Sequence, residues 1–535
     1  RNNKRYVNSI VDSIKRRIMM SSHEMGLYTT SGYYNYEGNR MQFRVIELSK
    51  VPIQIIAPYL PEERGKYIST FSLNSESSEN DEKEQAKKIL KALNDAGYDS
   101  LFVGGAVRDK FLGLEPKDYD IGTSATPSQV ANVINNLSGF TYVLGPEGDR
   151  AQRALTSLIN PEVGEQIEVT TYRKEMYGKD RADIDATPAK TFKEDAARRD
   201  LTINSMGETI DGEIIDYFGG KEDLENKKIR TVGNPNERFQ EDPLRIIRAI
   251  RFATKYNFSI DKETYAAIKK NKDLVKDLSS KRRRDEIGKV LVQPNGYKML
   301  METGILPALM PEFRNMTDYH HKLDYHPEGN LYNHYIEAFK KFTTIPNRTE
   351  LGAWALLFHD IAKPQTANWN EEGGYHTFYG HDKQGGLLVL ENYNNTKGPF
   401  EFSKKELQKI AWTTDNHLGK FWDMKKPTKV AKMRNDDNYP LLVQVVTGDT
   451  MGIRRGGDEA LASRLIEIDE ITDKINEQKL KTGNRPKDFA RKVIQELNVK
   501  NQEISIALNE IEELVSTGQV SSYDEALRVL KSKRQ

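Results

Sequence analysis

The chain of 535 residues contains no cysteine. This absence excludes disulfide bonds, thiolate nucleophiles and thiolate-bound zinc, and it fits a reducing compartment such as the cytoplasm, where we expect the protein to reside. The chain also lacks any apolar run near the roughly 18–20 residues that a membrane-spanning helix needs, so we expect no membrane partner. A net charge is nearly absent, because 80 basic side chains balance 79 acidic ones. A surface for nucleic acid must therefore be local.

A chain of this length exceeds the roughly 250–300 residues that one hydrophobic core usually supports, so we expect several domains. Residues 41–48 and 51–57 are expected to form strands in an N-terminal extension, residues 1–80, whose role the sequence does not reveal. The segment Ser72–Glu84 is rich in serine and acidic residues and is expected to be a flexible linker. A helix is expected to follow at Lys83–Ala96.

The first chemical motif combines a short apolar strand, a glycine pair and a basic residue at Leu101–Asp109. Gly104 and Gly105 lack a Cβ atom, so the backbone can turn sharply there and approach a ligand closely. The glycines open an expected helix, Val107–Leu112, whose free N–H groups favour an anion. Arg108 adds a planar fork of donors that suits phosphate oxygens.

Acidic residues follow the glycine motif. Asp118 and Asp120 lie two positions apart in a segment that is expected to be a strand, so both carboxylates should leave one face. Two carboxylates on a rigid face suit divalent cations beside a nucleotide triphosphate. Glu168, in the expected strand Gln166–Arg173, is a candidate for a third carboxylate. Taken singly, a Gly-Gly pair is usually only a turn, and an exposed strand glutamate is commonly inert.

Two further segments concentrate arginine and carboxylate residues, at Glu194–Met206 and Glu241–Phe252. Alone, the first could be the polar face of a helix with local ion pairs, and the second a capped helix with a charged stripe. In the second segment Asp242 is a plausible cap and Pro243 fits the first helical turn. A step of three residues makes Asp242 and Arg245 neighbours on the helix.

In this order and spacing, the motifs resemble those of class II tRNA nucleotidyltransferases and bacterial poly(A) polymerases, a branch of the DNA polymerase beta-like nucleotidyltransferases. The resemblance covers roughly residues 83–533. It implies that Mg²⁺ held by Asp118 and Asp120 activates the 3′ hydroxyl of the RNA and steadies pyrophosphate. The strand position of Glu168 makes it the candidate for a further catalytic carboxylate. It assigns nucleotide binding to Gly105, Arg108, Arg199, Asp242, Arg245, Arg248 and Arg251.

The resemblance also implies a way to select bases. The family is understood to use an Asp–Arg pair, which corresponds here to Asp242 and Arg245. Cytosine and adenine offer an amine donor beside a ring-nitrogen acceptor, whereas uracil and guanine offer a carbonyl and a ring N–H. The pair would admit CTP and ATP and reject UTP and GTP, with roughly 1–3 kcal/mol for a good bidentate contact. In the neck segment, Arg282 stands where the family usually has glutamate, so the role of that position is open.

The histidines mark a second region, because eight of the nine lie between His320 and His417. Their ordered series resembles the HD phosphohydrolase domain, relatives of which hydrolyse 2′,3′-cyclic phosphates and phosphomonoesters. Imidazole and carboxylate ligands suit Mg, Mn, Fe, Co or Ni better than a structural zinc. The resemblance implies metal ligands at His334, His359, Asp360 and Asp449, and a second metal position at His381 and His417.

The expected fold class is α+β, with a small polymerase-beta-like nucleotidyltransferase α/β head before a mostly α-helical neck, HD domain and tail. The expected domains are the extension at 1–80, the head at 81–205, the nucleotide-selecting neck and body at 206–305, the HD domain at 306–455 and the helical RNA-binding tail at 456–535.

The expected function is template-independent addition or repair of the 3′-terminal CCA of tRNA from CTP and ATP, with a metal-dependent phosphohydrolase in the HD domain and no DNA partner. A poly(A) polymerase, or an enzyme that adds only CC or only A, is an alternative that the sequence leaves open. The HD series favours the tRNA enzyme, since bacterial poly(A) polymerases generally lack it. An alternative from another class is an RNA-binding protein with an inactive head.

Overall fold

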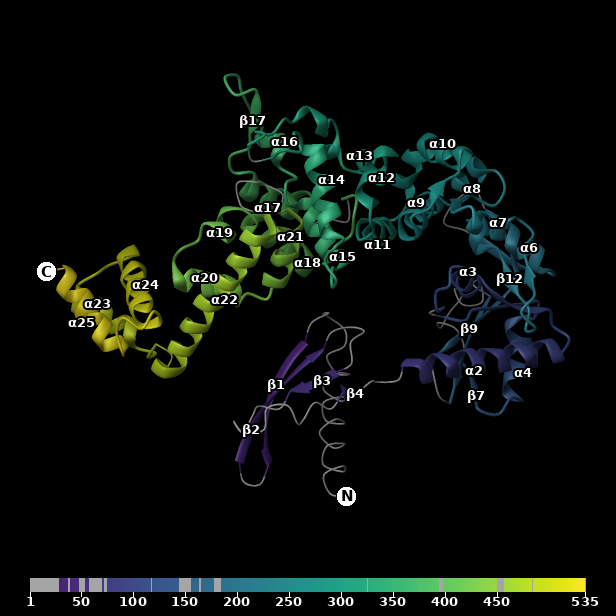
Figure 1. Ribbon diagram of the computed structural model, residues 1–535, viewed down its shortest axis with the longest axis horizontal. Coiled ribbons are helices and arrows are strands. Elements are labelled where there is room, and N and C mark those ends of the chain that lie inside the picture. Colours follow the sequence, from purple (N-terminus) through teal and green to yellow (C-terminus); the bar gives the residue numbers. More distant parts are fainter. Residues whose placement is uncertain are drawn as a thin grey trace. The chain divides into compact units, whose positions relative to one another are not determined.

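The structure is a computed structural model that describes residues 28–36, 39–47, 53–56, 70–71, 75–116, 118–143, 155–162, 165–177, 184–324, 326–393, 398–449, 457–483 and 485–534. The chain divides into two compact units. Unit 1 lies within Arg1–Phe102 and Asp118–Thr171, and unit 2 within Val103–Lys117 and Tyr172–Gln535. Strands make up much of unit 1 and helices dominate unit 2, so the predicted α+β class is confirmed (Figure 1).

The first sheet of unit 1 has antiparallel neighbours in the order β1-β2-β3-β4. Its strands are β1 (Tyr28–Tyr36), β2 (Asn39–Glu47), β3 (Ile53–Ile56) and β4 (Thr70–Phe71). The strands expected at residues 41–48 and 51–57 correspond to β2 and β3, so both predictions are confirmed.

Helix α2 (Ser75–Asp95) begins well before the expected Lys83. The prediction of a flexible linker is therefore wrong from Ser75 onward. The linker was inferred from scarce apolar residues, but glutamate and lysine are good helix formers that can extend a helix into solvent. An ion pair of 2.8 Å between Glu84 and Lys87 supports the exposed turn. The rest of the helix is anchored by fully buried side chains, namely Ala86, Ile89, Leu90 and Leu93.

The second sheet of unit 1 contains one parallel pair, β6 with β9, within the order β5-β6-β9-β8-β7. Its strands are β5 (Ser100–Val103), β6 (Ile121–Thr123), β7 (Phe140–Val143), β8 (Thr156–Pro161) and β9 (Ile167–Thr171). Helix α4 (Pro127–Asn135) packs on β7 and β8. It starts at a Thr126 capping box with proline in the first turn, which is a strong start signal in the sequence.

The expected strand at Asp118 and Asp120 is wrong in its position, because β6 begins only at Ile121. Within the described residues, the pairing of β5 with β6 stops at Phe102 and Ile121. Strand β5 ends one residue later, where the chain reaches the positive φ of 71° at Gly104. The aspartates therefore precede the strand and are not bound by its alternation of faces.

The small strands of unit 2 are β10 (Arg173–Tyr177), β11 (Ile184–Pro188), β12 (Gly207–Glu208), β13 (Ile214–Ile215), β14 (Lys228–Ile229), β15 (Ser259–Ile260), β16 (Asn368–Asn370) and β17 (Tyr375–Thr377). These strands form four pairs of consecutive strands, β10 with β11, β12 with β13, β14 with β15 and β16 with β17. Only the β14–β15 pair among these four is parallel.

The first half of unit 2 contains α3 (Gly105–Phe111), α6 (Phe192–Ala197), α7 (Gly220–Glu225), α8 (Pro235–Glu241), α9 (Leu244–Tyr256), α10 (Lys262–Asn271), α11 (Ser280–Leu291), α12 (Gly296–Glu302) and α13 (Ile305–Leu309). It also contains 3₁₀ turns at η1 (Thr202–Asn204), η2 (Lys272–Asp277), η3 (Pro311–Phe313) and η4 (Met316–Asp318).

The second half contains α14 (Leu331–Phe342), α15 (Glu350–Phe358), α16 (Lys363–Thr366), α17 (His381–Asn392), α18 (Lys404–Asn416), α19 (Gly419–Trp422), α20 (Pro427–Arg434), α21 (Tyr439–Asp449), α22 (Gly457–Thr482), α23 (Phe489–Leu497), α24 (Gln502–Ser516) and α25 (Tyr523–Arg534). Helix α15 packs against α11, α14, α18 and α21 (Figure 1). Its residues Ala353–Phe358 are fully buried.

The last three helices form a separate hydrophobic core. Ile511 and Val515 of α24 are buried in it, and Ile504 and Leu508 pack against it. The apolar stripe seen in the sequence is therefore a core face. Among the helices of the described residues, none combines the length and the apolar character that crossing a membrane would require.

Candidate active sites

Unit 1 contains the three carboxylates that the sequence analysis assigns to Mg²⁺ binding and catalysis. Asp118 is exposed and Asp120 is half-buried. Between them Tyr119 packs edge-on against the ring of Phe102 at 5.8 Å, which anchors the segment to the sheet. Strand β9 turns Ile167 and Val169 into the core and leaves Glu168 exposed, as the sequence predicts.

The parallel register relates Glu168 to the aspartates. Ile121 is the partner of Val169, so Asp120 and Glu168 precede the same rung of the two strands. Thr170 Oγ1 donates to Glu168 Oε1 at 3.2 Å. Among the described residues, the three carboxylates do not form a set whose oxygens all lie within 4.8 Å of one another. Carboxylates are nonetheless the ligand type that Mg²⁺ prefers, so the donor chemistry fits this metal.

In unit 2, Arg108 of α3 is buried and held on several sides. Its Nη1 donates to Asn204 Oδ1 at 2.6 Å and its Nε donates to Asp109 Oδ1 at 2.8 Å. The guanidinium lies over the rings of Phe252 and Tyr256, 5.0 and 5.2 Å from their centroids. The planar group is therefore fixed in orientation before any ligand arrives.

The glycine pair makes room for this arrangement. A Cβ on Gly104 would lie 3.2 Å from Arg199 Nη1, and the φ of 71° also favours glycine there. A Cβ on Gly105 would lie 3.6 Å from Arg108 Nη2, which is an ordinary contact. The structure thus explains the first glycine better than the second.

Arg199 and its neighbour Arg198 share one buried carboxylate, Asp195. Arg199 Nη2 donates to Asp195 Oδ2 at 2.9 Å, and Arg198 Nη2 donates to Oδ1 at 2.7 Å. Burial by itself raises the pKa of Asp195, but the two arginines outweigh it and hold the pKa below its usual value. Arg199 also donates to the backbone oxygen of Asn204 at 3.1 Å.

Asp200 supports a third arginine, Arg248 of α9, whose Nε donates to Asp200 Oδ2 at 2.6 Å. The other oxygen of Asp200 accepts from Leu201 N at 2.8 Å and from Asn204 Nδ2 at 3.1 Å. Burial alone raises the pKa of this carboxyl, but Arg248 outweighs it and lowers the pKa. The same pair raises the pKa of Arg248 against the opposite effect of burial.

Asp242 and Arg245, the expected base-reading pair, make side-chain contacts with different residues. Arg245 is buried, and its Nη1 donates to Glu241 Oε2 at 2.8 Å while its Nη2 donates to the Arg198 backbone oxygen at 2.8 Å. Asp242 accepts from the helix at Leu244 N, 3.1 Å away, as expected for a cap. Its two oxygens also accept from Arg282 Nη2 at 3.3 and 3.1 Å.

Arg251, the last arginine of the predicted set, faces a different partner. Its Nη1 lies 3.3 Å from Glu286 Oε1, and its guanidinium lies 4.7 Å from the centre of the Phe252 ring. Burial lowers its pKa, although Glu286 acts in the opposite direction. Sequence reasoning did not assign roles to Asp195, Glu241 or Glu286. The spacing of four residues from Asp195 to Arg199 and from Glu241 to Arg245 was the available signal for the first two.

The second candidate site collects six predicted residues from five helices of unit 2. His334 lies in α14, His359 and Asp360 follow α15, His381 opens α17, His417 follows α18 and Asp449 ends α21. All are buried except Asp449, whose side chain is 15% exposed. The structure thus brings together residues that are up to 115 positions apart.

The ligand atoms form two groups whose members lie within 4.8 Å of one another, His334 with His359 and Asp449, and Asp360 with His381 and His417. Asp360 joins the groups. Its Oδ2 is 3.2 Å from the Nε2 atoms of both His334 and His359. Its Oδ1 is 3.1 Å from His381 Nε2 and 3.7 Å from His417 Nε2. A carboxylate between two ligand groups suits a site for two cations.

Backbone contacts on the side facing away from the cluster fix the tautomers of three rings. The Nδ1 atoms of His359, His381 and His417 each lie 2.6 Å from a backbone oxygen, of Leu356, Phe378 and Thr414 in turn. A carbonyl oxygen only accepts, so Nδ1 carries the proton, and in the neutral ring Nε2 offers a lone pair to the cluster. Lone pairs and carboxylate oxygens that converge in this way fit a divalent metal.

The histidines and carboxylates of the cluster shift each other's pKa values. Burial lowers the pKa of His359, but Asp360 and Asp449 outweigh it and raise the pKa to about 9. Burial raises the pKa of Asp360, yet His359 and Lys363 outweigh it and hold the pKa well below its usual value. Lys363 Nζ lies 2.6 Å from Asp360 Oδ2. Sequence reasoning missed Lys363, although it stands three positions after Asp360 on the same turn.

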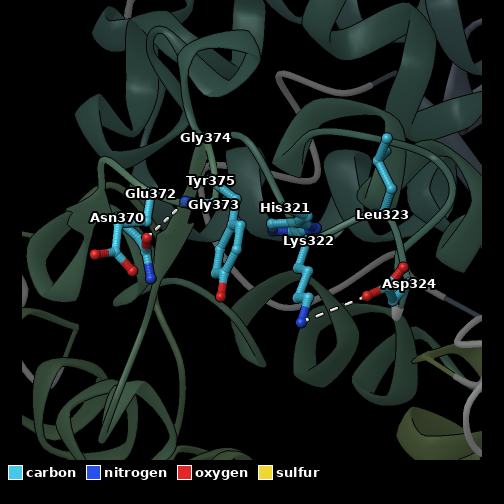
Figure 2. A pocket seen from close by; sticks show the side chains of 9 residues that line it. All are labelled: His321, Lys322, Leu323, Asp324, Asn370, Glu372, Gly373, Gly374 and Tyr375. Atoms are coloured by element: carbon cyan, nitrogen blue, oxygen red, sulfur yellow. Dashed lines mark hydrogen bonds and ion pairs between the residues drawn. The ribbon is translucent and has the colours of Figure 1, made fainter.

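A pocket of about 440 Å³ adjoins this cluster. Figure 2 shows that residues 321–324 form one side of it and residues 370–375, around the β16–β17 turn, the other. His321 lines the pocket and is 4% exposed, and its ring centre is 5.6 Å from that of His334. Lys322 lies over the Tyr375 ring at 5.7 Å. The pocket was not predicted, since its two sides are remote in sequence.

Comparison with known proteins identifies the first region. Residues 100–230 match the family described as "Poly A polymerase head domain", and residues 257–316 match "Probable RNA and SrmB- binding site of polymerase A". The chain is 37% identical to the CCA-adding enzyme of Bacillus subtilis over 278 residues, 52% of this chain and 64% of that protein. It is also 37% identical to Poly(A) polymerase I of Salmonella typhimurium over 257 residues, 45% of this chain and 52% of that protein.

The chain therefore spans less than two thirds of the length of these curated relatives. Its fold is similar to the crystal structure of Bacillus stearothermophilus CCA-adding enzyme in complex with CTP, with a TM-score of 0.60 and 22% identity. That similarity covers 84% of this chain and 98% of the other. The resemblance predicted from the motifs of the first region is thus confirmed: residues 100–230 and 257–316 are similar to tRNA nucleotidyltransferases and poly(A) polymerases.

Proposed function

We propose that this protein adds or repairs the 3′-terminal CCA of tRNA, using CTP and ATP without a nucleic-acid template and releasing pyrophosphate. The observation that carries the proposal is the convergence of three arginines on the turn Asp200–Asn204. Arg108 and Arg199 are held by Asn204, and Arg248 by Asp200. Three oriented guanidinium groups at one turn suit a triphosphate, which offers several anionic oxygens.

The carboxylates Asp118 and Asp120 are assigned to Mg²⁺, with Glu168 as a further catalytic carboxylate. When bound, the metal would lower the pKa of the attacking 3′ hydroxyl and neutralise charge on the leaving pyrophosphate. The chain itself supplies arginines that are already oriented, so little reorganisation is needed when charge shifts toward the leaving group. The anchored Tyr119 keeps the aspartates just before the start of β6.

Base selection is assigned to Asp242 and Arg245. The carboxylate of Asp242 has acceptor capacity for an exocyclic amine, and the guanidinium of Arg245 has donors for a ring nitrogen. Glu241 and the Arg198 backbone hold Arg245 in place. A fixed donor beside a fixed acceptor favours cytosine and adenine over uracil and guanine, which supports CTP and ATP as the substrates.

A pyrophosphate-release assay tests the proposal. The full chain would be incubated with Mg²⁺, a tRNA transcript lacking CCA and each nucleotide in turn. We expect release that depends on the tRNA, with CTP on this transcript and with ATP once CC is present. The double variant Asp118→Asn/Asp120→Asn should lose release at least ~100-fold, whereas the exposed control Asp95→Asn should not. Equal activity in the double variant would contradict the assignment, and absent release in the wild type would favour an RNA-binding protein with an inactive head.

We also propose a second activity, metal-dependent hydrolysis of phosphate esters at the His/Asp cluster. It is supported by a cluster of six ligand side chains, Asp360 and five around it, and by the adjoining pocket. Oxygen and nitrogen ligands of this kind suit Mg, Mn, Fe, Co or Ni. Such a metal would supply a bound water of lowered pKa. Lys363 beside Asp360 adds a positive charge that suits an anionic substrate.

Hydrolysis of 2′,3′-cyclic AMP and of p-nitrophenyl phosphate with Mn²⁺, Co²⁺ or Ni²⁺ tests the second activity. We expect turnover that falls at least ~100-fold in His359→Ala/Asp360→Ala while pyrophosphate release remains. The same loss should not occur in Asp118→Asn/Asp120→Asn. Absence of turnover with every metal would contradict the phosphohydrolase proposal and leave the transferase proposal intact.

A further inference from the structure

Glu328 is a buried carboxylate that has no role in either proposed reaction. It precedes α14 and its side chain is 6% exposed. Its Oε1 lies 2.9 Å from His334 Nδ1 and 2.8 Å from His326 Nδ1. His321 Nδ1 is further away, at 3.9 Å. Among the described residues, its ion-pair partners are thus three imidazole rings.

The contact with His334 determines which ring nitrogen faces the cluster. An ionised carboxylate only accepts hydrogen bonds, so His334 Nδ1 must carry a proton. Nε2 of the same ring then points to His359 Nε2, Asp360 Oδ2 and Asp449 Oδ1, each 3.2 Å away. The other three rings of the cluster are held by neutral backbone oxygens. His334 is therefore the one cluster histidine in the described chain whose outer partner carries a charge.

We propose that Glu328 is the positioning residue of the metal centre, which fixes the tautomer and orientation of His334 and makes its Nε2 a stronger donor to a divalent cation. The inference rests on the metal centre proposed above. A carboxylate behind a ligating imidazole raises the basicity of the ligand and holds its ring, and loss of such a partner typically costs 10–100-fold in metal affinity or activity.

Charge balance supports the same role. Glu328 is buried next to imidazoles, and its Oε2 has no hydrogen-bond partner in the described part of the chain. A buried anion is costly unless a positive charge lies nearby. A divalent cation bound to His334 Nε2 would place a positive charge on the opposite side of the imidazole ring that Glu328 contacts.

An alternative use of the same atoms is a metal site made by His321, His326, Glu328 and His334 themselves, whose ligand atoms lie within 4.8 Å of one another. In that case His334 would bind through Nδ1 and present a proton on Nε2 to the cluster. Two carboxylate oxygens at 3.2 Å from His334 Nε2 favour the cation on the inner side instead. The stoichiometry of binding separates the two arrangements.

The test is titration of the full, metal-stripped chain with Mn²⁺ and Co²⁺, followed by calorimetry and, for Mn²⁺, by electron paramagnetic resonance. The variants are Glu328→Gln, which keeps one acceptor oxygen without charge, and Glu328→Ala, which keeps neither. Glu337→Gln is the matched control, since Glu337 lies on the same helix three residues after His334 and pairs with Lys340 at 3.3 Å. The melting temperature of each metal-free variant is measured in parallel.

We expect wild type and Glu337→Gln to bind alike, Glu328→Gln to bind at least ~10-fold more weakly, and Glu328→Ala more weakly still. Stoichiometry should be unchanged in Glu328→Gln, and metal-free melting temperatures should stay within a few degrees. Unchanged affinity in both Glu328 variants would overturn the inference alone. If the Glu328 variants bound one metal ion fewer and held the remaining ions with unchanged affinity, the inference would be overturned in favour of a metal held by Glu328 itself. Absence of binding by the wild type would overturn the metal centre as well.

Discussion

Asp200 shows at the scale of one residue how burial and charge are balanced in unit 2. The carboxyl is 8% exposed, and burial alone would favour its neutral form. Arg248 at 2.6 Å, Asn204 and the Leu201 amide reverse that preference and lower the pKa. The same carboxylate therefore stabilises the fold and aligns an arginine of the proposed triphosphate site.

Replacement of Asp200 with asparagine has an effect that depends on pH. Because its folded pKa lies below the unfolded value of about 3.9, the ionised carboxyl stabilises the fold above that pH, and the contribution is lost as pH falls through the folded pKa. We expect Asp200→Asn to cost roughly 1–3 kcal/mol at pH 7 and to reduce the loss of stability below pH 4. Denaturant unfolding at several pH values measures both effects. The exposed control Asp211→Asn should change neither, and an unaltered acid limb in Asp200→Asn would contradict the account.

Glu241 is the residue that holds Arg245, so it should influence base selection without touching the base. In Glu241→Gln the charged partner at 2.8 Å is replaced by a neutral amide, so the guanidinium of Arg245 is held less firmly than by the ion pair. We expect UTP use relative to CTP to rise about 5–10-fold, within the roughly 1–3 kcal/mol that a bidentate base contact contributes. Competition between the two nucleotides on one tRNA transcript measures the ratio. Glu237→Gln on the same helix is the control, and equal ratios in all three proteins would exclude this role for Glu241.

At the scale of elements, close packing of α17 on α18 sets the distance between two histidines of the cluster. His381 opens α17 and His417 follows α18. Between the helices lies Gly385, where an added Cβ would be 2.9 Å from Thr414 Cγ2. Thr414 is fully buried, so its side chain has little space to move. The glycine therefore allows the approach that brings both rings to Asp360.

Substitution of Gly385 with valine should move α17 away from α18 and weaken the metal site. We expect Mn²⁺ affinity to fall at least ~10-fold, and overpacking to cost about 1–3 kcal/mol in stability. Calorimetry on the metal-stripped protein and denaturant unfolding measure the two quantities. Gln384→Val, at the exposed neighbouring position of the same helix, should leave the affinity unchanged. Full affinity in Gly385→Val would show that the helix spacing does not control the site.

Elements also show where sequence reasoning succeeds. The start of α4 at Thr126 and Pro127 and the apolar stripe of α24 follow from local chemistry, so they could be predicted. The aspartates were placed inside β6 because alternation suggested a strand, but strand limits depend on a partner that the local sequence does not reveal. The early start of α2 was missed because low apolar content was taken as disorder.

For the whole molecule, the order of the sequence motifs was sufficient to predict the α+β class and the similarity of residues 100–230 and 257–316 to tRNA nucleotidyltransferases and poly(A) polymerases. It was also sufficient to name six residues that the structure brings to one cluster. The partners of those residues could not be predicted in the same way. Asn204, Glu286 and Glu328 act through contacts made by the tertiary fold, and a single sequence gives no distance between segments.

We propose above all that this chain completes the CCA end of tRNA without a template. The most direct test is to supply Mg²⁺, all four nucleotides and tRNA transcripts that end at the discriminator base, at C or at CC, and to sequence the 3′ ends of the products. The account predicts that every transcript ends in CCA and grows no further. A long run of A would instead show a poly(A) polymerase, addition of only CC or only A would show a partial enzyme, and unextended transcripts would contradict the transferase proposal altogether.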